Sequence, residues 1–250
     1  MFQAREICLS LAKHLKAWAA WAGYHIVRNH NNPEHTLAGL GGLDFRTIID
    51  IGANTGQFAR DIRARFPTAR IYCFEPVPQA FAMLEAWAAA DGRAEAVQLA
   101  LGDEPGRVEM FVHTNATTSS SLLPTTSRSH ELYPTTVKQT TVSVAVQRLD
   151  DWARLSGADL ARALVKIDVQ GYEANVLRGG PNVLAKAKAV IIEVNIEGLY
   201  EGQGRFRDLV QLLDAAGLKY AGNLSQACAA DGRIVFVDAV FVRPDNEAPQ

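Results

Sequence analysis

The sequence predicts an α/β protein built on a doubly wound, mostly parallel sheet with helices on both faces. Short apolar segments rich in β-branched residues alternate along the chain with segments whose apolar residues recur at helical spacing, which is the order typical of such a sheet. Two of the predicted strands end at an acidic residue, Glu75 and Asp168. Right-handed crossovers place the carboxyl ends of parallel strands on one rim, so we expect a binding site there.

The predicted elements follow one another in three groups. The first part of the chain predicts strands at 47–51, 70–74 and 96–101, with helices at 55–66 and 79–90. The middle predicts strands at 107–113 and 139–146, joined by a Ser/Thr-rich segment at 114–136. A connection that long is usually functional or disordered. The last part predicts strands at 163–167, 189–194 and 233–242 and helices at 172–178 and 206–216.

The two ends of the chain differ from this pattern. Apolar residues at helical spacing predict an amphipathic helix over 7–22, followed by a loop or linker over 25–42. Such a helix packs on the main domain, contacts a second copy, or covers a pocket as a lid, and the sequence leaves these alternatives open. We therefore expect an N-terminal helix and linker at 1–45, a main domain at 46–243 and a frayed polar tail at 244–250.

Composition excludes several classes of protein. Hydrophobic residues make up 48% of the 250, so global disorder is excluded, and a formal net charge of −2 argues against a nucleic-acid partner held by bulk charge. The three cysteines lie far apart, which excludes a disulfide framework and a structural zinc site. No apolar run reaches the ~20 residues of a membrane span, and the N-terminus lacks the pattern of a secretory signal. We expect a cytoplasmic protein without a membrane span.

The turn after the first predicted strand is the most informative segment. Gly52 follows Asp50 at a strand-to-helix junction, and Gly56 lies where the helix begins. Gly52 can adopt a positive φ and lets a ligand approach the backbone. Glu75 ends the next strand, where a carboxylate can accept hydrogen bonds from both hydroxyls of a ribose. Together these residues predict a nucleoside site.

The identity of that nucleoside depends on two positions. A dinucleotide fingerprint requires further glycines where this chain has Asn54 and Gln57, and Asp50 would place a carboxylate beside the phosphates. S-adenosylmethionine instead presents a sulfonium and an amino group, which Asp50 would attract. The residues favour this donor, and a nicotinamide-dependent enzyme remains the alternative.

Four motifs in order resemble those of the FkbM-type methyltransferases. They are DIGANTG at 50–56, FEP at 74–76, ALGD at 100–103 and KIDVQGYE at 166–173. The resemblance runs from about residue 47 to about residue 242. It implies a Rossmann-like class I methyltransferase fold of seven strands, S-adenosylmethionine as donor, and a hydroxyl acceptor on a sugar, glycan or secondary metabolite. A non-catalytic S-adenosylmethionine-binding protein would keep the same motifs.

The resemblance also implies a role for each matched residue. The methionine part of the donor would lie on the glycine turn, the ribose on the acidic strand end, and the adenine beside the third strand. The implied cofactor-binding residues are Asp50, Gly52, Asn54, Thr55, Gly56, Glu75, Pro76, Leu101, Gly102 and Asp168. Asp168 would face both donor and acceptor.

Methyl transfer to oxygen requires a hydroxyl held in line with the sulfonium and a group that removes its proton. Asp168 is the predicted base, with His113 as a second candidate. Many relatives carry glutamate where this chain has Gln170. An amide is a weak metal ligand, so we expect no metal site, although Mg²⁺ held by Asp168, water and substrate stays open.

The acceptor is expected to be a small hydroxylated molecule, either a sugar or a natural product. Ser119, Ser120 and Ser121 in the long segment, with Asn115, supply groups that can bind a polyol. Glu193 either binds an acceptor hydroxyl or is a buried carboxylate satisfied by the backbone. The sequence does not decide whether the chain forms a homo-oligomer.

Overall fold

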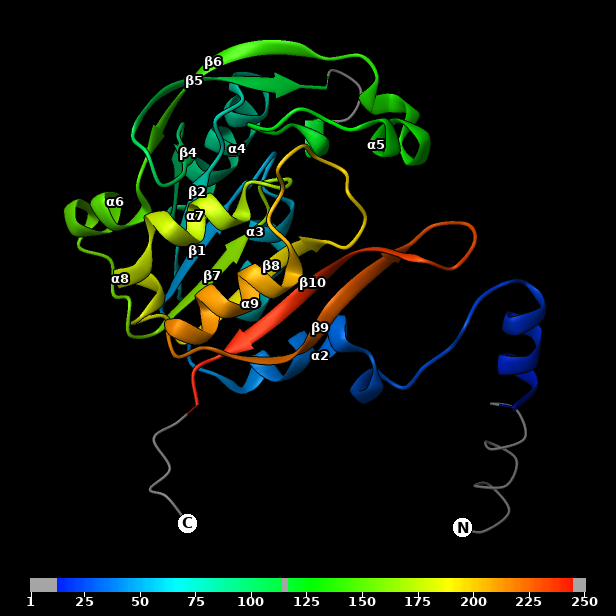
Figure 1. Cartoon of the computed structure of the whole chain (residues 1–250). Coiled ribbons are helices and arrows are strands. Elements are labelled where there is room, and N and C mark those ends of the chain that lie inside the picture. Colours follow the sequence, from blue (N-terminus) through cyan, green and yellow to red (C-terminus); the bar gives the residue numbers. More distant parts are fainter. Residues whose placement is uncertain (1–12, 114–116, 245–250) are drawn as a thin grey trace.

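The computed structural model describes residues 13–113 and 117–244. Its centre is a seven-stranded sheet in the order β3-β2-β1-β7-β8-β10-β9 (Figure 1). Its strands, in chain order, are β1 (Thr47–Ile51), β2 (Arg70–Phe74), β3 (Ala94–Val97), β7 (Ala163–Ile167), β8 (Ala189–Asn195), β9 (Lys219–Cys228) and β10 (Ile234–Val242). The first five strands in sheet order pair in parallel, and β10 is antiparallel to both of its neighbours. The predicted mostly parallel, seven-stranded sheet is confirmed.

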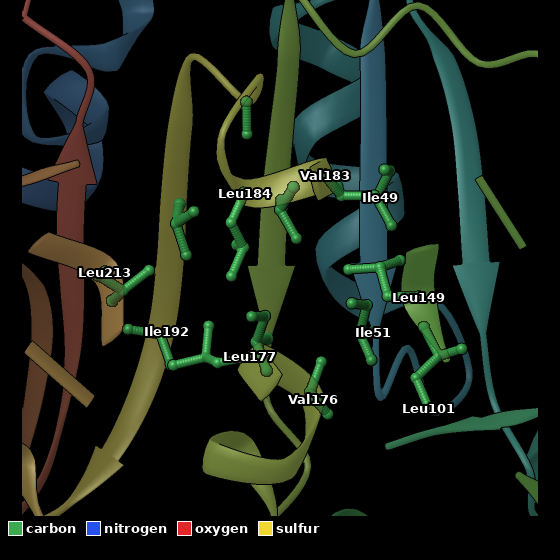
Figure 2. Close-up of a cluster of buried hydrophobic side chains, with 14 of the residues drawn as sticks. Ile49, Ile51, Leu101, Leu149, Val176, Leu177, Val183, Leu184, Ile192 and Leu213 are labelled. Carbon is green, nitrogen blue, oxygen red and sulfur yellow. The ribbon is translucent and has the colours of Figure 1, made fainter. Parts of the chain in front are cut away.

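Helices cover both faces of this sheet, which explains why every residue of β1, β7 and β8 is buried. One face packs on α6 (Leu149–Ser156), α7 (Glu173–Gly179), α8 (Pro181–Leu184) and α9 (Phe206–Ala215). The other packs on α3 (Gln57–Arg65) and α4 (Pro78–Asp91). Figure 2 shows Ile192 of the sheet beside Leu177 of α7, and both belong to the first core.

The predicted third strand is in fact two strands in different sheets. β3 closes the edge of the main sheet, whereas β4 (Ala100–Leu101) pairs in parallel with β6 (Thr140–Gln147) in a second sheet. β5 (Gly106–Val112) completes this three-stranded sheet by pairing antiparallel with β6. The apolar residues from 96 to 101 pack on three separate hydrophobic clusters, so their periodicity alone did not show the break.

The long Ser/Thr-rich segment between β5 and β6 contains regular structure in its described residues. It contains η3 (Thr117–Ser119), α5 (Ser127–Leu132) and η4 (Pro134–Thr136), and its residues 114–116, including Asn115, lie outside the described part. The Thr126 side chain accepts a hydrogen bond from Ser129 N and so caps α5. The prediction of a long loop missed these short helices because each is too short to show a periodicity.

The N-terminal part divides into two portions. Residues 13–21 are helical, and Leu15, Trp18 and Trp21 on this helix are exposed; the predicted residues 7–12 lie outside the described part. The expected linker contains η1 (Asn29–Asn31), α2 (Pro33–Thr36) and η2 (Leu37–Gly42). Leu37 and Leu40 join the core under β1, so this portion packs on the main domain. The predicted tail lies outside the described residues from position 245.

No helix in the described ranges is both long and apolar enough to cross a membrane.

Candidate active site

A cavity of about 320 Å³ opens at the carboxyl ends of β1, β2 and β7, the rim where the sequence predicts the site. Its walls come from the turn after β1, the end of β2, the second sheet and the segment that follows β7. The predicted site residues that line it are Gly52, Asn54, Glu75, Pro76, Leu101, Ser120 and Asp168. The cavity is in the size range of small-molecule sites.

The turn after β1 is shaped by three residues in the left-handed region. Gly52 has φ +80°, Asn54 +47° and Gly56 +88°. A Cβ atom on Gly52 would lie 1.8 Å from the carbonyl oxygen of Asp168, so only glycine fits where the ends of β1 and β7 meet. The predicted positive φ of Gly52 is confirmed, and its closest neighbour is the Asp168 backbone. The turn after β1 therefore lies directly against the backbone of Asp168.

Glu75 is held rigidly at the end of β2. Its Oε2 atom accepts a hydrogen bond from Asn54 N, and its Oε1 atom accepts one from Val77 N, each at 2.8 Å. The side chain is 5% exposed, and burial raises the pKa of its carboxyl to about 7, although the two backbone N–H groups oppose this shift. Each oxygen keeps a lone pair that can accept a hydroxyl, so Glu75 suits the predicted contact with a ribose.

The Asp168 carboxylate is held by two neighbouring side chains. Its Oδ2 atom lies 3.0 Å from Lys166 Nζ, and its Oδ1 atom accepts a hydrogen bond of 2.7 Å from Gln170 Nε2. Lys166 Nζ also lies 3.6 Å from Asp50 Oδ1, so the ammonium group is between two carboxylates. Burial tends to lower the pKa of Lys166, but the charges of Asp168 and Asp50 outweigh it and raise the pKa above its ordinary value. Lys166 therefore carries its positive charge in the cavity wall.

Gln170 connects Asp168 to a second buried carboxylate. Its Nε2 atom also donates to Glu193 Oε1 at 2.7 Å, and its Oε1 atom accepts a hydrogen bond of 2.6 Å from the Tyr200 hydroxyl. The backbone of Gln170 has φ +54°, and its carbonyl oxygen accepts a hydrogen bond from Ser121 Oγ. Burial, followed by the charge of Asp168, raises the pKa of Glu193 well above its usual range.

Glu173 supports the backbone beneath this network. Its Oε1 atom accepts hydrogen bonds from Val169 N at 3.1 Å and from Gly171 N at 3.0 Å. The residue is 1% exposed, and burial raises the pKa of its carboxyl to about 7. Glu173 therefore fixes the loop that carries Asp168 and Gln170.

Several predicted site residues do not line the cavity. Asp50 is fully buried below the turn and reaches the cavity only through Lys166. Glu193 lies behind Gln170, and its bond partner is that side chain rather than the backbone. His113 is also fully buried, and burial lowers the pKa of its imidazole. The other residues outside the lining are Thr55, Gly56, Gly102, Ser119 and Ser121.

Three of these residues nevertheless support the walls through their backbone. A Cβ atom on Gly56 would come within 2.9 Å of Leu84, so glycine allows the start of α3 to pack on α4. Gly102 N donates to Gln147 O, which joins the end of β4 to β6. Ser119 places its carbonyl oxygen 3.1 Å from the Tyr200 hydroxyl.

The sequence patterns missed Tyr200 and the bridging role of Gln170. Tyr200 follows β8 in a segment without a motif, and only the folded chain brings it to Gln170, thirty positions away. Lys166 and Asp168 are two residues apart, which places them on one face of an extended chain, and their side chains are in contact.

The described residues contain no group of three or more His, Cys, Asp or Glu arranged to hold a metal ion. The carboxylates of Asp168 and Glu193 are joined instead by the amide of Gln170.

A mostly parallel sheet with a glycine turn after β1, an acidic residue after β2 and a cavity at the carboxyl ends of these strands is the arrangement expected of a Rossmann-like class I methyltransferase fold. The family model described as the methyltransferase FkbM domain matches residues 50–220. The chain belongs to the FkbM methyltransferase family, and it is an S-adenosylmethionine-dependent methyltransferase. The nicotinamide alternative is thereby set aside.

Named relatives agree with this family. The chain is 32% identical over 173 residues to 2-O-methyltransferase NoeI of Sinorhizobium fredii, covering 66% of this chain and 70% of that protein. It is 29% identical over 191 residues to 31-O-demethyl-FK506 methyltransferase FkbM of Streptomyces tacrolimicus, covering 68% and 71%. Among solved structures, the fibrillarin of Aeropyrum pernix with natively bound S-adenosyl-L-methionine aligns at a TM-score of 0.48 and 11% identity, over 82% of this chain and 71% of that one.

Proposed function

We propose that this enzyme transfers the methyl group of S-adenosylmethionine to a hydroxyl of a sugar, glycan or secondary metabolite. Two relatives named for O-methylation support this acceptor atom. The observation that carries the proposal is the position of Asp168, a partly exposed carboxylate on the cavity wall that is held by Lys166 and Gln170. A carboxylate fixed in this way can accept the proton that a hydroxyl loses during methyl transfer.

The cavity suits the donor on chemical grounds. Glu75 would hold the two ribose hydroxyls with the lone pairs that Asn54 N and Val77 N leave free. Pro76, Leu99 and Leu101 give the same cavity an apolar wall on which an adenine can lie. When bound, the donor supplies an electrophilic methyl group on a sulfonium.

The acceptor side of the cavity is polar. Thr117, Thr118 and Ser120 from the long segment line the cavity together with the turn after β1. Their side chains can hydrogen-bond to a polyol and hold one hydroxyl near Asp168, which reduces the entropic cost of the reaction. Among the predicted substrate-binding serines, Ser120 is the one in the cavity wall, while Ser121 is directed to the Gln170 carbonyl oxygen.

The experiment has two stages. Isothermal titration calorimetry with S-adenosylmethionine and S-adenosylhomocysteine measures donor binding, and a panel of glycans and hydroxylated natural products is then screened for a mass gain of one methyl group. Transfer to oxygen supports the proposal. Methyl transfer to nitrogen or carbon only would contradict the proposal. Donor binding without methyl transfer to any acceptor in a broad panel would also contradict it, and would favour a non-catalytic donor-binding protein.

A further inference from the structure

Residues 13–31 form a segment that does not line the cavity. All of them are exposed except Ala19, and their helix stands apart from the two sheets (Figure 1). Trp21 is 85% exposed, Tyr24 73% and Trp18 65%. Most of the stability of a protein helix comes from packing its apolar face, so this helix gains little from the rest of the described chain.

The apolar and charged side chains of this helix lie on different sides. Successive residues of a helix are about 100° apart, so Leu15, Trp18 and Trp21 lie along one side of it. Lys13 and Lys16 lie on the opposite side. Tyr24, Ile26 and Val27 continue the exposed apolar surface beyond the helix. We call residues 13–31 the cationic aromatic segment.

The charge of this segment has one sign. It carries Lys13, Lys16 and Arg28, and the sequence has no acidic residue between Glu6 and Glu34. The whole chain has a formal net charge of −2, so the segment is locally opposite in charge to the molecule. Two copies of the segment would repel each other, whereas an anionic surface would attract it.

We propose that the cationic aromatic segment binds the surface of an anionic lipid membrane. Tryptophan and tyrosine favour the boundary between headgroups and acyl chains, because they have an apolar ring and a polar group. Lysine and arginine on the opposite side attract anionic headgroups. The segment would lie in the plane of the membrane and hold the enzyme at its surface, independently of which acceptor the enzyme methylates.

The test uses the full-length chain and vesicle co-sedimentation. One set of vesicles contains phosphatidylcholine and phosphatidylglycerol in equal parts, and the other contains phosphatidylcholine alone. We expect binding to the anionic vesicles at low salt, weaker binding at high salt, and little binding to the neutral vesicles. No binding to the anionic vesicles at low salt would overturn the proposal.

Two double variants separate charge from apolar contact. Lys13→Glu/Lys16→Glu should weaken vesicle binding by roughly tenfold or more. Trp18→Ala/Trp21→Ala should weaken it by a similar factor through loss of the aromatic rings. The matched control Lys138→Glu/Lys186→Glu changes the same charge at two exposed lysines of the main domain and should bind like the wild type.

Two readouts make the result decisive. Because the segment does not line the cavity, all variants should bind S-adenosylmethionine with equal affinity in calorimetry. Equal affinity also shows that each variant has folded. Light scattering measures the oligomeric state. An equal loss of vesicle binding in the lysine control would overturn the proposal. The proposal would also be overturned if the wild type were a dimer, and if Trp18→Ala/Trp21→Ala dissociated this dimer without changing vesicle binding. That result would assign the aromatic surface to contact with a second copy of the chain.

Discussion

The side-chain amide of Gln170 donates to the carboxylate of Asp168 and, with the same nitrogen, to that of Glu193, each at 2.7 Å. The Tyr200 hydroxyl donates to the amide oxygen, which turns the amide nitrogen toward the two carboxylates. One neutral residue therefore links Asp168, the proposed base in the cavity wall, to a buried carboxyl group behind it. Lys166 supplies the positive charge on the other side of Asp168.

Replacing Gln170 should slow the reaction without preventing donor binding. Gln170→Met keeps the length of the side chain but removes the bond that orients Asp168, so we expect kcat to fall by roughly tenfold to a hundredfold. The dissociation constant of S-adenosylmethionine should change by less than about twofold. Gln226→Met, at an exposed position on β9, is the control and should keep full turnover. Unchanged kcat in Gln170→Met would show that Asp168 does not need this contact.

Asp168→Asn tests the base itself. The amide occupies the same volume but cannot accept a proton, so steady-state kinetics should show a loss of kcat of about a hundredfold or more. Donor affinity measured by calorimetry should be nearly preserved, because the turn after β1 and Glu75 remain intact. If donor affinity falls as far as turnover does, Asp168 holds the donor and is not the base.

Donor affinity should depend on pH through Glu75. Its pKa of about 7 in the free protein means that the carboxyl is largely protonated at pH 6, while acceptance of two ribose hydroxyls favours the ionised form. Affinity should therefore rise as pH increases toward about 7 and level off above it. Calorimetry from about pH 5.5 to about pH 8.5, which extends roughly one and a half units to each side of the shifted pKa, measures this.

The matched comparison uses Glu75→Gln. An amide cannot accept from both Asn54 N and Val77 N, so this variant should bind the donor at least roughly tenfold more weakly and lose the pH dependence. Glu85→Gln, at an exposed position on α4, should behave like the wild type. A wild-type affinity that is flat across pH 7 would contradict the assigned role of Glu75.

Stability should depend on pH through Glu173. Its pKa is about 7 in the folded protein and 4.5 in the unfolded chain, so the folded state binds a proton that the unfolded state releases between these values. The contribution of this proton to the free energy of unfolding is complete below about pH 4.5, decreases as pH rises, and is lost above about pH 7. It amounts to roughly 3 kcal/mol. Glu173→Gln keeps an acceptor for Val169 N and Gly171 N without titrating. Urea unfolding at pH 5 and pH 8 should show a smaller difference in the free energy of unfolding for this variant, and an equal difference would contradict the assignment.

Gly52→Ala should be strongly destabilising. The new methyl group would lie 1.8 Å from the Asp168 carbonyl oxygen, at a residue whose φ of +80° disfavours a side chain. We expect a loss of more than about 2 kcal/mol in the free energy of unfolding. Gly106→Ala is the control, since a Cβ atom there meets nothing within 4 Å, and it should change stability by less than about 0.5 kcal/mol. Equal effects of the two substitutions in thermal or urea unfolding would refute the close approach of β1 and β7.

Much of the fold could be predicted because its signals are local. β1, β2 and β7 are short buried strands whose apolar residues stand together in the sequence, and α4 is a continuous helix-forming segment. The signal failed where two short elements share one apolar run, as in β3 and β4. It also failed for β9, whose residues are mostly half-buried or exposed and so show little hydrophobic pattern.

By itself, the sequence determined the order of most strands and long helices, the glycine turn after β1, and the presence of carboxylates at the ends of β2 and β7. These follow from residue types within a few positions of one another, so periodicity and motif spacing record them. Only the tertiary structure decided that Asp50 acts through Lys166, that His113 lies away from the cavity, and that Gln170 joins Asp168 to Glu193 and Tyr200. Those contacts depend on how distant segments pack, because a hydrogen bond is made or lost over less than 1 Å and no local pattern specifies distances between separate loops.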